Sequence, residues 1–287
     1  MGDRDSMSRS PLFLWIAFVL VHGWLGWQGF IAESVPYGDV SFVYSFWAHQ
    51  AVSGGPVVGI DTQWVYPILA FIPMVIPTLG GLIPTDSYPY AWIVLVTLVH
   101  AVAFSFLIGS WSRRSHSQLG EHARGNQPTS VRVVAAWWWL ALLLCLGPVS
   151  VSRIDSIATP IAMVGLVFAI SRTTVATTLL TIAAWIKVWP AAIVGALWVA
   201  GRGRTRIVVA AAMTSAVVVS IALVLGAGGN VLSFLTQQTG RGLQIESPAS
   251  NFFVWMAAAR VPGFAVYYDQ ALLTFQVRGA GADVVAQ

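Results

Sequence analysis

Long apolar runs separated by short polar stretches dominate the pattern along the chain. The first run is Leu12–Ala32, and several runs of similar character follow it up to residue 225. Runs of about 17–25 apolar residues can cross about 30 Å of hydrocarbon as helices, whereas the strands of a membrane β-barrel alternate with a period of two residues. These runs do not alternate. The pattern therefore predicts an all-α polytopic integral membrane protein.

The order of the runs predicts a single transmembrane domain over residues 1–287. After the first span we expect an external loop over residues 33–88, further spans over 90–226 and an external stretch over 227–287. Six membrane elements are expected, and an alternative count is seven. The predicted spans are Leu12–Ala32, Tyr90–Gly109, Val133–Gly147, Ile157–Ile170, Val175–Ala200 and Ile207–Leu225.

Two of the apolar runs are interrupted. Trp64–Ile83 contains three prolines and a Gly-Gly pair, so it is either a poor span or an interfacial segment. We favour the interfacial interpretation, because it places the basic loop at residues 111–132 in the cytoplasm. Val175–Ala200 contains Lys187 and Pro190 in its middle. Both its ends can lie inside if two short helices meet near Lys187 as a broken hairpin, with the irregular backbone buried in protein or lining a cavity.

The placement of charge orients the predicted bundle. The chain is 57% hydrophobic and 9% charged, whereas a soluble domain carries about 25% charged residues. The most basic loops, at residues 111–132 and 201–206, belong in the cytoplasm by the positive-inside rule. We therefore expect a multi-pass plasma-membrane protein with a cytoplasmic N-terminus, in contact with membrane lipids. No basic stripe follows a soluble face, so no nucleic acid is expected as a partner.

Familiar motifs of soluble enzymes do not occur in the sequence. It has no phosphate loop, no His-Glu-x-x-His pair and no nucleophile elbow. The five histidines are scattered without metal-ligand spacing, so no metal site is expected. The single cysteine, Cys145, excludes an internal disulfide. Candidate chemistry is therefore sought among the charged residues at the membrane surface.

Asp39 follows the first span and would lie at the outer membrane surface, beside aromatic residues. One interpretation is a solvated loop carboxylate or a helix N-cap, since the residues that follow are spaced to share one face of a helix lying flat on the membrane. That face comprises Val40, Val43, Tyr44 and Trp47. The other interpretation is a general base at the membrane surface. The residues alone leave both open.

Other charged residues beside apolar runs also have two interpretations, because charge is costly in a bilayer. Arg153 and Asp155 are an interfacial pair or a helix cap, or they line a polar site at the external face. Lys187 either snorkels to the inner surface or meets an anionic headgroup in a buried cavity. Asp61 is most simply a loop residue.

The stretch Gly240–Pro248 combines Arg241, Gln244 and Glu246 with two glycines. It is either an ordinary loop or a phosphate clamp, since a guanidinium group matches the geometry of a phosphate and flanking glycines let the backbone approach closely.

Taken in order, five motifs resemble the GT-C glycosyltransferases of family 87 (the DUF2029 group). The resemblance spans roughly residues 12–250, and its last motif is the most specific. The motifs are Gly38-Asp39-Val40 with Tyr44, Trp64-Val-Tyr-Pro67 with Leu69 and Pro73, Arg153-Ile-Asp155, Ile186-Lys-Val-Trp-Pro190 and Arg241-Gly-Leu-Gln-Ile-Glu-Ser247.

The resemblance implies a GT-C-like bundle with juxtamembrane helices in the external loop, and Asp39 as catalytic base. It implies a polyprenyl-phosphate sugar as donor, with mannose our first choice, and a cell-envelope glycolipid or polysaccharide as acceptor. Lys187 and Arg241 are then expected to bind the donor phosphate. No cofactor is expected, although some GT-C relatives bind a divalent metal. Supporting polar groups of the site are expected at Arg153, Asp155, Gln244, Glu246 and Tyr66.

Two further expectations follow from the whole chain. Family members carry more spans after the point at which this chain stops, Gln287, so the resemblance implies a C-terminally truncated member. The alternative to an enzyme is a non-catalytic protein, either a lipid or polysaccharide transporter or an accessory subunit. A transporter predicts charges along a path across the membrane and two matching halves. Here the charges gather toward the outer face, and no internal repeat aligns.

Overall fold

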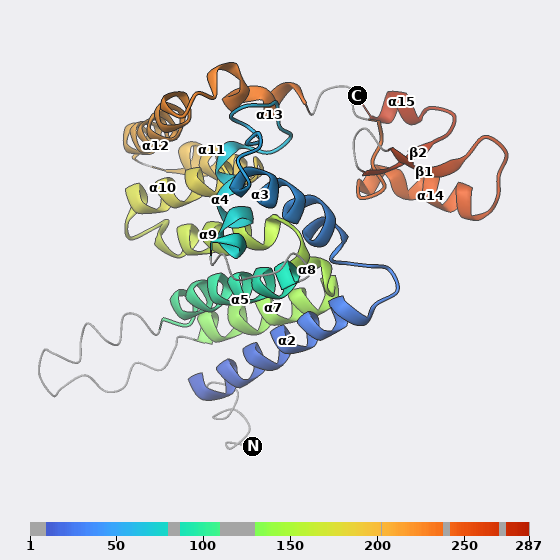
Figure 1. The fold of residues 1–287 in the computed structure, drawn as a ribbon. Coiled ribbons are helices and arrows are strands. Elements are labelled where there is room, and N and C mark those ends of the chain that lie inside the picture. The colour runs from blue at the N-terminus through green and yellow to red at the C-terminus, as the bar shows by residue number, and fades with distance from the viewer. Residues whose placement is uncertain are drawn as a thin grey trace, which may run out of the picture. The chain divides into compact units, whose positions relative to one another are not determined.

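The structure, a computed structural model, describes residues 10–79, 87–109, 130–201, 203–237, 242–269 and 274–286. It divides into two compact units, Met1–Leu232 and Ser233–Gln287, where the sequence predicts one domain. Elements carry the labels of Figure 1.

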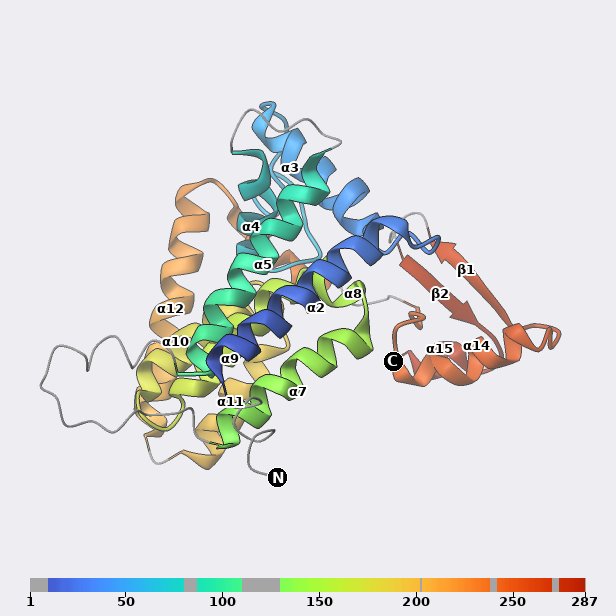
Figure 2. The ribbon, with the colours of Figure 1, turned by 90° about the horizontal axis from the view of Figure 1, so that it is seen from below.

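The first unit is a bundle of helices that pack side by side. Its helices include α2 (Pro11–Ile31), α5 (Tyr88–Leu107), α7 (Ser130–Leu146), α8 (Val149–Ser152), α9 (Asp155–Phe168), α10 (Thr173–Ala184), α11 (Pro190–Ala200) and α12 (Arg204–Val224), with the turn η5 (Gly228–Leu232) after them. α9 lies between α5 and α10, and α10 also packs against α11 and α12 (Figure 1). α2 runs beside α5 and α7 (Figure 2).

Large side chains from the helices and from their connections fill one continuous core. Trp92, Tyr44 and Phe104 are among its fully buried members. Burying a side chain of this size contributes about 1.5–3 kcal/mol. The outward faces of α2, α5 and α12 expose large apolar residues instead, as suits helices that face lipid rather than water.

Two histidines form a hydrogen-bonded chain through this core. Nε2 of His22 lies 3.0 Å from Nδ1 of His100, and Nε2 of His100 lies 2.8 Å from the carbonyl oxygen of Ser156. Nδ1 of His22 lies 2.9 Å from the carbonyl oxygen of Phe18. Both rings are buried. The chain joins α2, α5 and α9 in a region where an unpartnered polar group costs several kcal/mol.

Short helices occur in the stretch between α2 and α5. They are η1 (Asp39–Tyr44), α3 (Ser45–Val52), η2 (Ile68–Ala70), α4 (Phe71–Val75) and η3 (Ile76–Thr78). A helix of five residues such as α4 is about 7.5 Å long and cannot cross about 30 Å of hydrocarbon by itself. The prolines predicted the interruption: Pro67 is the N-cap of η2, Pro73 lies within α4 and Pro77 lies in the first turn of η3. The external location of residues 33–88 stays a prediction.

The predicted apolar face after Asp39 is confirmed. Val40 and Tyr44 are buried, and Val43 and Trp47 pack against the same core. The segment therefore adheres to the bundle through the face that its spacing indicates.

The apolar stretch at residues 175–200 is broken where the sequence indicates. α10 ends at Ala184 and α11 begins at Pro190, and Lys187 lies between them. A proline suits the first helical position, because its missing N–H would have no intrahelical partner there.

Three described helices, α2, α5 and α12, are long and apolar enough to cross a membrane. α7, α9, α10 and α11 are apolar but shorter, with 17, 14, 12 and 11 residues. The first unit is thus a helical membrane protein, as predicted. The number of spans, six or seven, stays a prediction.

The second unit combines short helices with a two-stranded antiparallel sheet, which the sequence did not indicate. Ala265 of β1 (Ala265–Asp269) pairs with Arg278 of β2 (Thr274–Arg278). The stretch 243–245 pairs with β2 as well, since the N–H of Val277 donates to the carbonyl of Leu243. The helices are α13 (Ser233–Thr236), η6 (Pro248–Ser250), α14 (Asn251–Ala258) and α15 (Ala282–Val285). The unit has its own small core around Leu243, Phe253 and Val277.

Candidate functional site

Asp39 and Arg153 meet in the first unit, although 114 residues separate them along the chain. Nη1 of Arg153 donates a hydrogen bond to Oδ2 of Asp39. The side chain of Asp39 is 27% exposed and that of Arg153 is 39% exposed. The pair is therefore oriented by a charge-assisted hydrogen bond and remains within reach of a substrate.

The backbone around Asp39 is unusual. Asp39 is the first residue of η1, which is a π-helix, and Gly38 occupies the N-cap position. The interpretation of Asp39 as the N-cap is therefore wrong. π-helical turns are rare and occur frequently at functional sites. The buried residues of this turn, Val40 and Tyr44, anchor it in the core, and Arg153 holds the carboxylate of Asp39.

A second ion pair forms two residues after Arg153. Nζ of Lys187 lies 3.3 Å from Oδ2 of Asp155, and Nε1 of Trp189 donates to Oδ1 of Asp155 over 3.0 Å. Nζ of Lys187 also lies 5.1 Å from the centre of the Tyr66 ring, within the range of a cation–π interaction. The structure thus brings together Asp155, Lys187 and Tyr66, three residues that the sequence indicated for the site.

The break between α10 and α11 explains how Lys187 reaches Asp155. Asp155 is the first residue of α9, where the helix dipole favours a carboxylate. Residues 185–189 leave the helical path before Pro190 starts α11. The two side chains that the break frees, those of Lys187 and Trp189, both contact this carboxylate.

Tyr44 joins the element that carries Asp39 to the turn that carries Arg153. Its hydroxyl oxygen accepts a hydrogen bond of 3.2 Å from the N–H of Ile154. Burial, reinforced by the nearby Tyr66 and Asp39, raises the pKa of Tyr44 well above its ordinary value of 10. The phenol therefore stays neutral at physiological pH and acts as a fixed bridge rather than as an acid or a base.

Two further hydrogen bonds hold the walls of the site. The N–H of Leu69 donates to the carbonyl of Trp185 over 3.0 Å, which ties the segment after Tyr66 to the end of α10. Nε1 of Trp92, which is fully buried, donates to the carbonyl of Val151 over 3.0 Å and so ties α5 to α8. Groups supported in this way from rigid elements are held in a defined geometry.

The remaining predicted residues lie elsewhere. Arg241 lies outside the described residues. Gln244 and Glu246 belong to the second unit, where Gln244 forms an antiparallel bridge with Gln276 and Glu246 is exposed. A Cβ atom at Gly242 would clash with Oε1 of Gln276. Packing against Gln276 therefore explains the glycine at this position. The phosphate-clamp role of Arg241 stays a prediction.

The arrangement in the first unit is suited to acid–base and phosphate chemistry. Asp39 offers a carboxylate that can accept a proton, and Arg153 and Lys187 offer positive charge a short distance away. Aromatic rings of Tyr44, Tyr66 and Trp189 surround these groups. Among the residues that the structure describes, no three His, Cys, Asp or Glu side chains lie close enough to share a metal ion.

Sequence reasoning missed two residues of this arrangement as site residues, Tyr44 and Trp189. Both belong to the quoted motifs, five residues after Asp39 and two residues after Lys187. An aromatic side chain with a polar atom so close to a candidate charge is the signal that points to each of them.

Comparison with known proteins gave one match. The model described as glycosyltransferase family 87 matches residues 64–283, which is more than half of the chain. The matched range includes Tyr66, Arg153, Asp155 and Lys187, and it begins after Asp39. No curated protein and no solved structure matched.

Proposed function

The chain belongs to glycosyltransferase family 87, and on this basis we propose that it transfers a sugar, mannose in the first instance, from a polyprenyl-phosphate donor. The acceptor is a cell-envelope glycolipid or polysaccharide on the outer face of the plasma membrane. Family membership makes the protein a membrane glycosyltransferase. The observation that carries the finer proposal is the polar cluster, defined here as Asp39, Arg153, Asp155 and Lys187.

Asp39 is the catalytic base in this proposal. The acceptor hydroxyl oxygen forms a bond to the anomeric carbon, and its proton passes to the carboxylate of Asp39. The bond between the anomeric carbon and the phosphate oxygen breaks, and the phosphate leaves with the electron pair. The hydrogen bond from Arg153 keeps the carboxylate in one orientation, which favours proton transfer by a positioned base.

Lys187 balances the charge of the leaving phosphate, a role that the family resemblance also predicts for Arg241. Fixed positive charge near the leaving oxygen stabilises the transition state most strongly where water is excluded. In the structure Lys187 forms its ion pair with the carboxylate of Asp155. Donor phosphate therefore competes with Asp155 for Lys187, and the Tyr66 ring keeps the ammonium group in place.

The distribution of charge over the bundle supports an outer location of the polar cluster. The end of α9 opposite Asp155 lies beside the end of α5, since the rings of Phe106 and Phe168 are 5.7 Å apart. The described charged residues near that end are Arg132, Arg172, Arg204 and Arg206. The positive-inside rule assigns this arginine end to the cytoplasm, and the carboxylate-bearing end then faces outward.

A transfer assay tests the proposal. Membranes that contain the full chain are supplied with labelled polyprenyl-phosphate mannose and cell-envelope lipids, and label in the acceptor is measured. We expect transfer, and we expect Lys187→Gln to raise the KM for the donor by about tenfold or more through loss of a charged contact worth about 1.5–3 kcal/mol. Arg172→Gln removes the same charge at the other end of the bundle and serves as the matched control.

Two results contradict the proposal. One is absence of transfer from every lipid-linked sugar by folded protein in the membrane. The other is passage of the labelled lipid across a sealed bilayer without formation of a glycosidic bond, which favours the transporter.

A further inference from the structure

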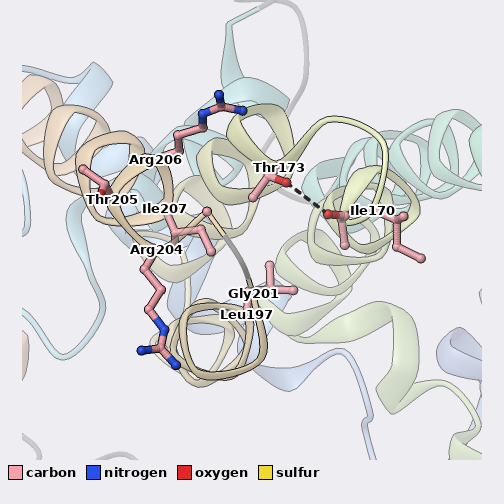
Figure 3. A pocket seen from close by; sticks show the side chains of 10 residues that line it. Ile170, Thr173, Leu197, Gly201, Arg204, Thr205, Arg206 and Ile207 are labelled. Carbon is pink, nitrogen blue, oxygen red and sulfur yellow. Dashed lines mark hydrogen bonds between the residues drawn. The ribbon is translucent and has the colours of Figure 1, made fainter.

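A cavity of about 700 Å³ lies at the arginine end of the bundle, apart from the polar cluster. Figure 3 shows the residues that line it. Its walls are the turn after α9, the end of α11 and the start of α12. Small-molecule sites in proteins have volumes of about 300–1,000 Å³. α9 starts at Asp155 in the polar cluster and ends at Phe168 beside the cavity, and a helix of 14 residues is about 21 Å long. The cavity is therefore a separate site.

The lining of the cavity has an apolar and a polar part. Its apolar part is formed by Ile170, Leu197 and Ile207, and its polar part includes the hydroxyls of Thr173 and Thr205. Ile170 is fully exposed at the rim. A lining of this mixed kind suits a ligand that has a hydrocarbon portion next to a polar head.

The two arginines that line the cavity have different surroundings. Nε and Nη2 of Arg204 donate to the carbonyls of Trp198 and Val199, and its guanidinium group lies 5.5 Å from the Trp198 ring. Arg204 thus caps the C-terminal end of α11. Arg206 leaves α12 in the opposite direction (Figure 3). Within the described ranges, Arg206 has no hydrogen-bond or ion-pair partner.

We propose that this cavity binds the phosphodiester headgroup of an anionic glycerophospholipid, with Arg206 as its cation. A guanidinium group binds phosphate oxygens in pairs, and basic pockets between membrane helices are suited to anionic lipid headgroups. The apolar wall contacts the glycerol and the first acyl carbons. Inorganic phosphate is negatively charged like the headgroup, but it has no hydrocarbon portion to contact the apolar wall. This site does not depend on the proposed sugar transfer.

Native mass spectrometry of the full chain in detergent tests the proposal. Palmitoyl-oleoyl phosphatidylglycerol is compared with phosphatidylcholine of the same acyl chains. We expect one phosphatidylglycerol retained per chain, at an affinity about tenfold or more above that of phosphatidylcholine, because a charged contact is worth about 1.5–3 kcal/mol. Arg206→Gln abolishes this preference, and Arg206→Lys retains part of it.

Matched variants separate the site from general charge. Arg172→Gln removes the same charge at the same end of the bundle but does not line the cavity, so it keeps the wild-type preference. Ala169→Phe fills the cavity without a change of charge and loses the lipid. Melting temperatures identify variants that fail to fold.

Two results overturn the proposal. One is equal retention of phosphatidylglycerol by the Arg206→Gln and Arg172→Gln variants. The other is displacement of the lipid by millimolar inorganic phosphate, which indicates a site for a soluble anion. This experiment does not measure sugar transfer, so a negative result for lipid binding does not affect the proposed transferase function. Likewise, a negative transfer assay does not affect the proposed lipid site.

Discussion

Arg153 donates a hydrogen bond to Asp39, across 114 residues of the chain. This contact joins the π-helical turn after the first span to the turn between α8 and α9. Both side chains are more than a quarter exposed, so the ion pair adds no more than about 1 kcal/mol to stability. Its consequence is orientation, because it fixes where the carboxylate of Asp39 points.

Replacement of Arg153 separates orientation from stability. Arg153→Gln removes the cation that holds Asp39. We expect kcat to fall by about tenfold or more, since a misplaced base loses much of its contribution, while the free energy of unfolding changes by no more than about 1 kcal/mol. Transfer assays and thermal unfolding measure the two effects. An Arg153→Gln enzyme with wild-type kcat contradicts the positioning role.

The Tyr66 ring is expected to act on donor binding through Lys187. Tyr66→Leu removes the ring that lies 5.1 Å from Nζ of Lys187. A partly exposed cation–π contact is worth about 0.5–1 kcal/mol, so the KM for the donor should rise about two- to fivefold. Tyr66→Phe keeps the ring and is the control, with a KM near the wild-type value. Equal KM values for the Leu and Phe variants would show that the ring does not hold Lys187.

The hydroxyl of Tyr44 is expected to matter for stability, but not for the pH dependence of the rate. Tyr44→Phe leaves the N–H of Ile154 without its partner, which costs about 1–3 kcal/mol for a buried group. Because the pKa of Tyr44 is raised well above 10, the phenol stays protonated throughout a pH–rate profile measured from about pH 6 to pH 9. The variant should therefore show a lower melting temperature and a pH–rate profile of unchanged shape. If the pH–rate profile of the Tyr44→Phe variant lost its acidic or its basic limb, Tyr44 would not be a neutral bridge.

The buried histidine chain is expected to stabilise the bundle. His100→Leu removes the partner of both His22 and the carbonyl of Ser156. Buried polar groups left without partners cost about 1–3 kcal/mol each, so the melting temperature should fall clearly. His49→Leu is the control, because the hydrogen bonds described for His49 are both to Ser45, within α3. A His100→Leu protein as stable as the His49→Leu protein would contradict this role.

The helices were largely predictable, because local sequence determines them. The span predicted at Tyr90–Gly109 is α5 at Tyr88–Leu107, and the interruption indicated by Lys187 and Pro190 lies between α10 and α11. The length of an apolar run and the position of a proline are both features of the local sequence. The hairpin of β1 and β2 was missed, since two strands of five residues leave a weak signal after long apolar runs.

The members of the polar cluster were also predictable, but their partners were not. The order of the motifs indicated Asp39, Arg153, Asp155 and Lys187. The structure pairs Arg153 with Asp39 and Lys187 with Asp155. These pairings depend on how α9 packs between α5 and α10, and the spacing of charges along the chain does not contain that information. The π-helical turn at Asp39 has no sequence signal that we can name.

Replacement of Asp39 tests the central claim most directly. Asp39→Asn keeps the size of the side chain but cannot accept the acceptor proton, and Asp61→Asn is the matched control, since Asp61 is an exposed carboxylate that accepts from the N–H of Val57. Transfer from polyprenyl-phosphate mannose is measured for both. We predict that kcat falls about a hundredfold or more for Asp39→Asn and stays near the wild-type value for Asp61→Asn. Transfer by Asp39→Asn at the wild-type rate would contradict the assignment of Asp39 as the base.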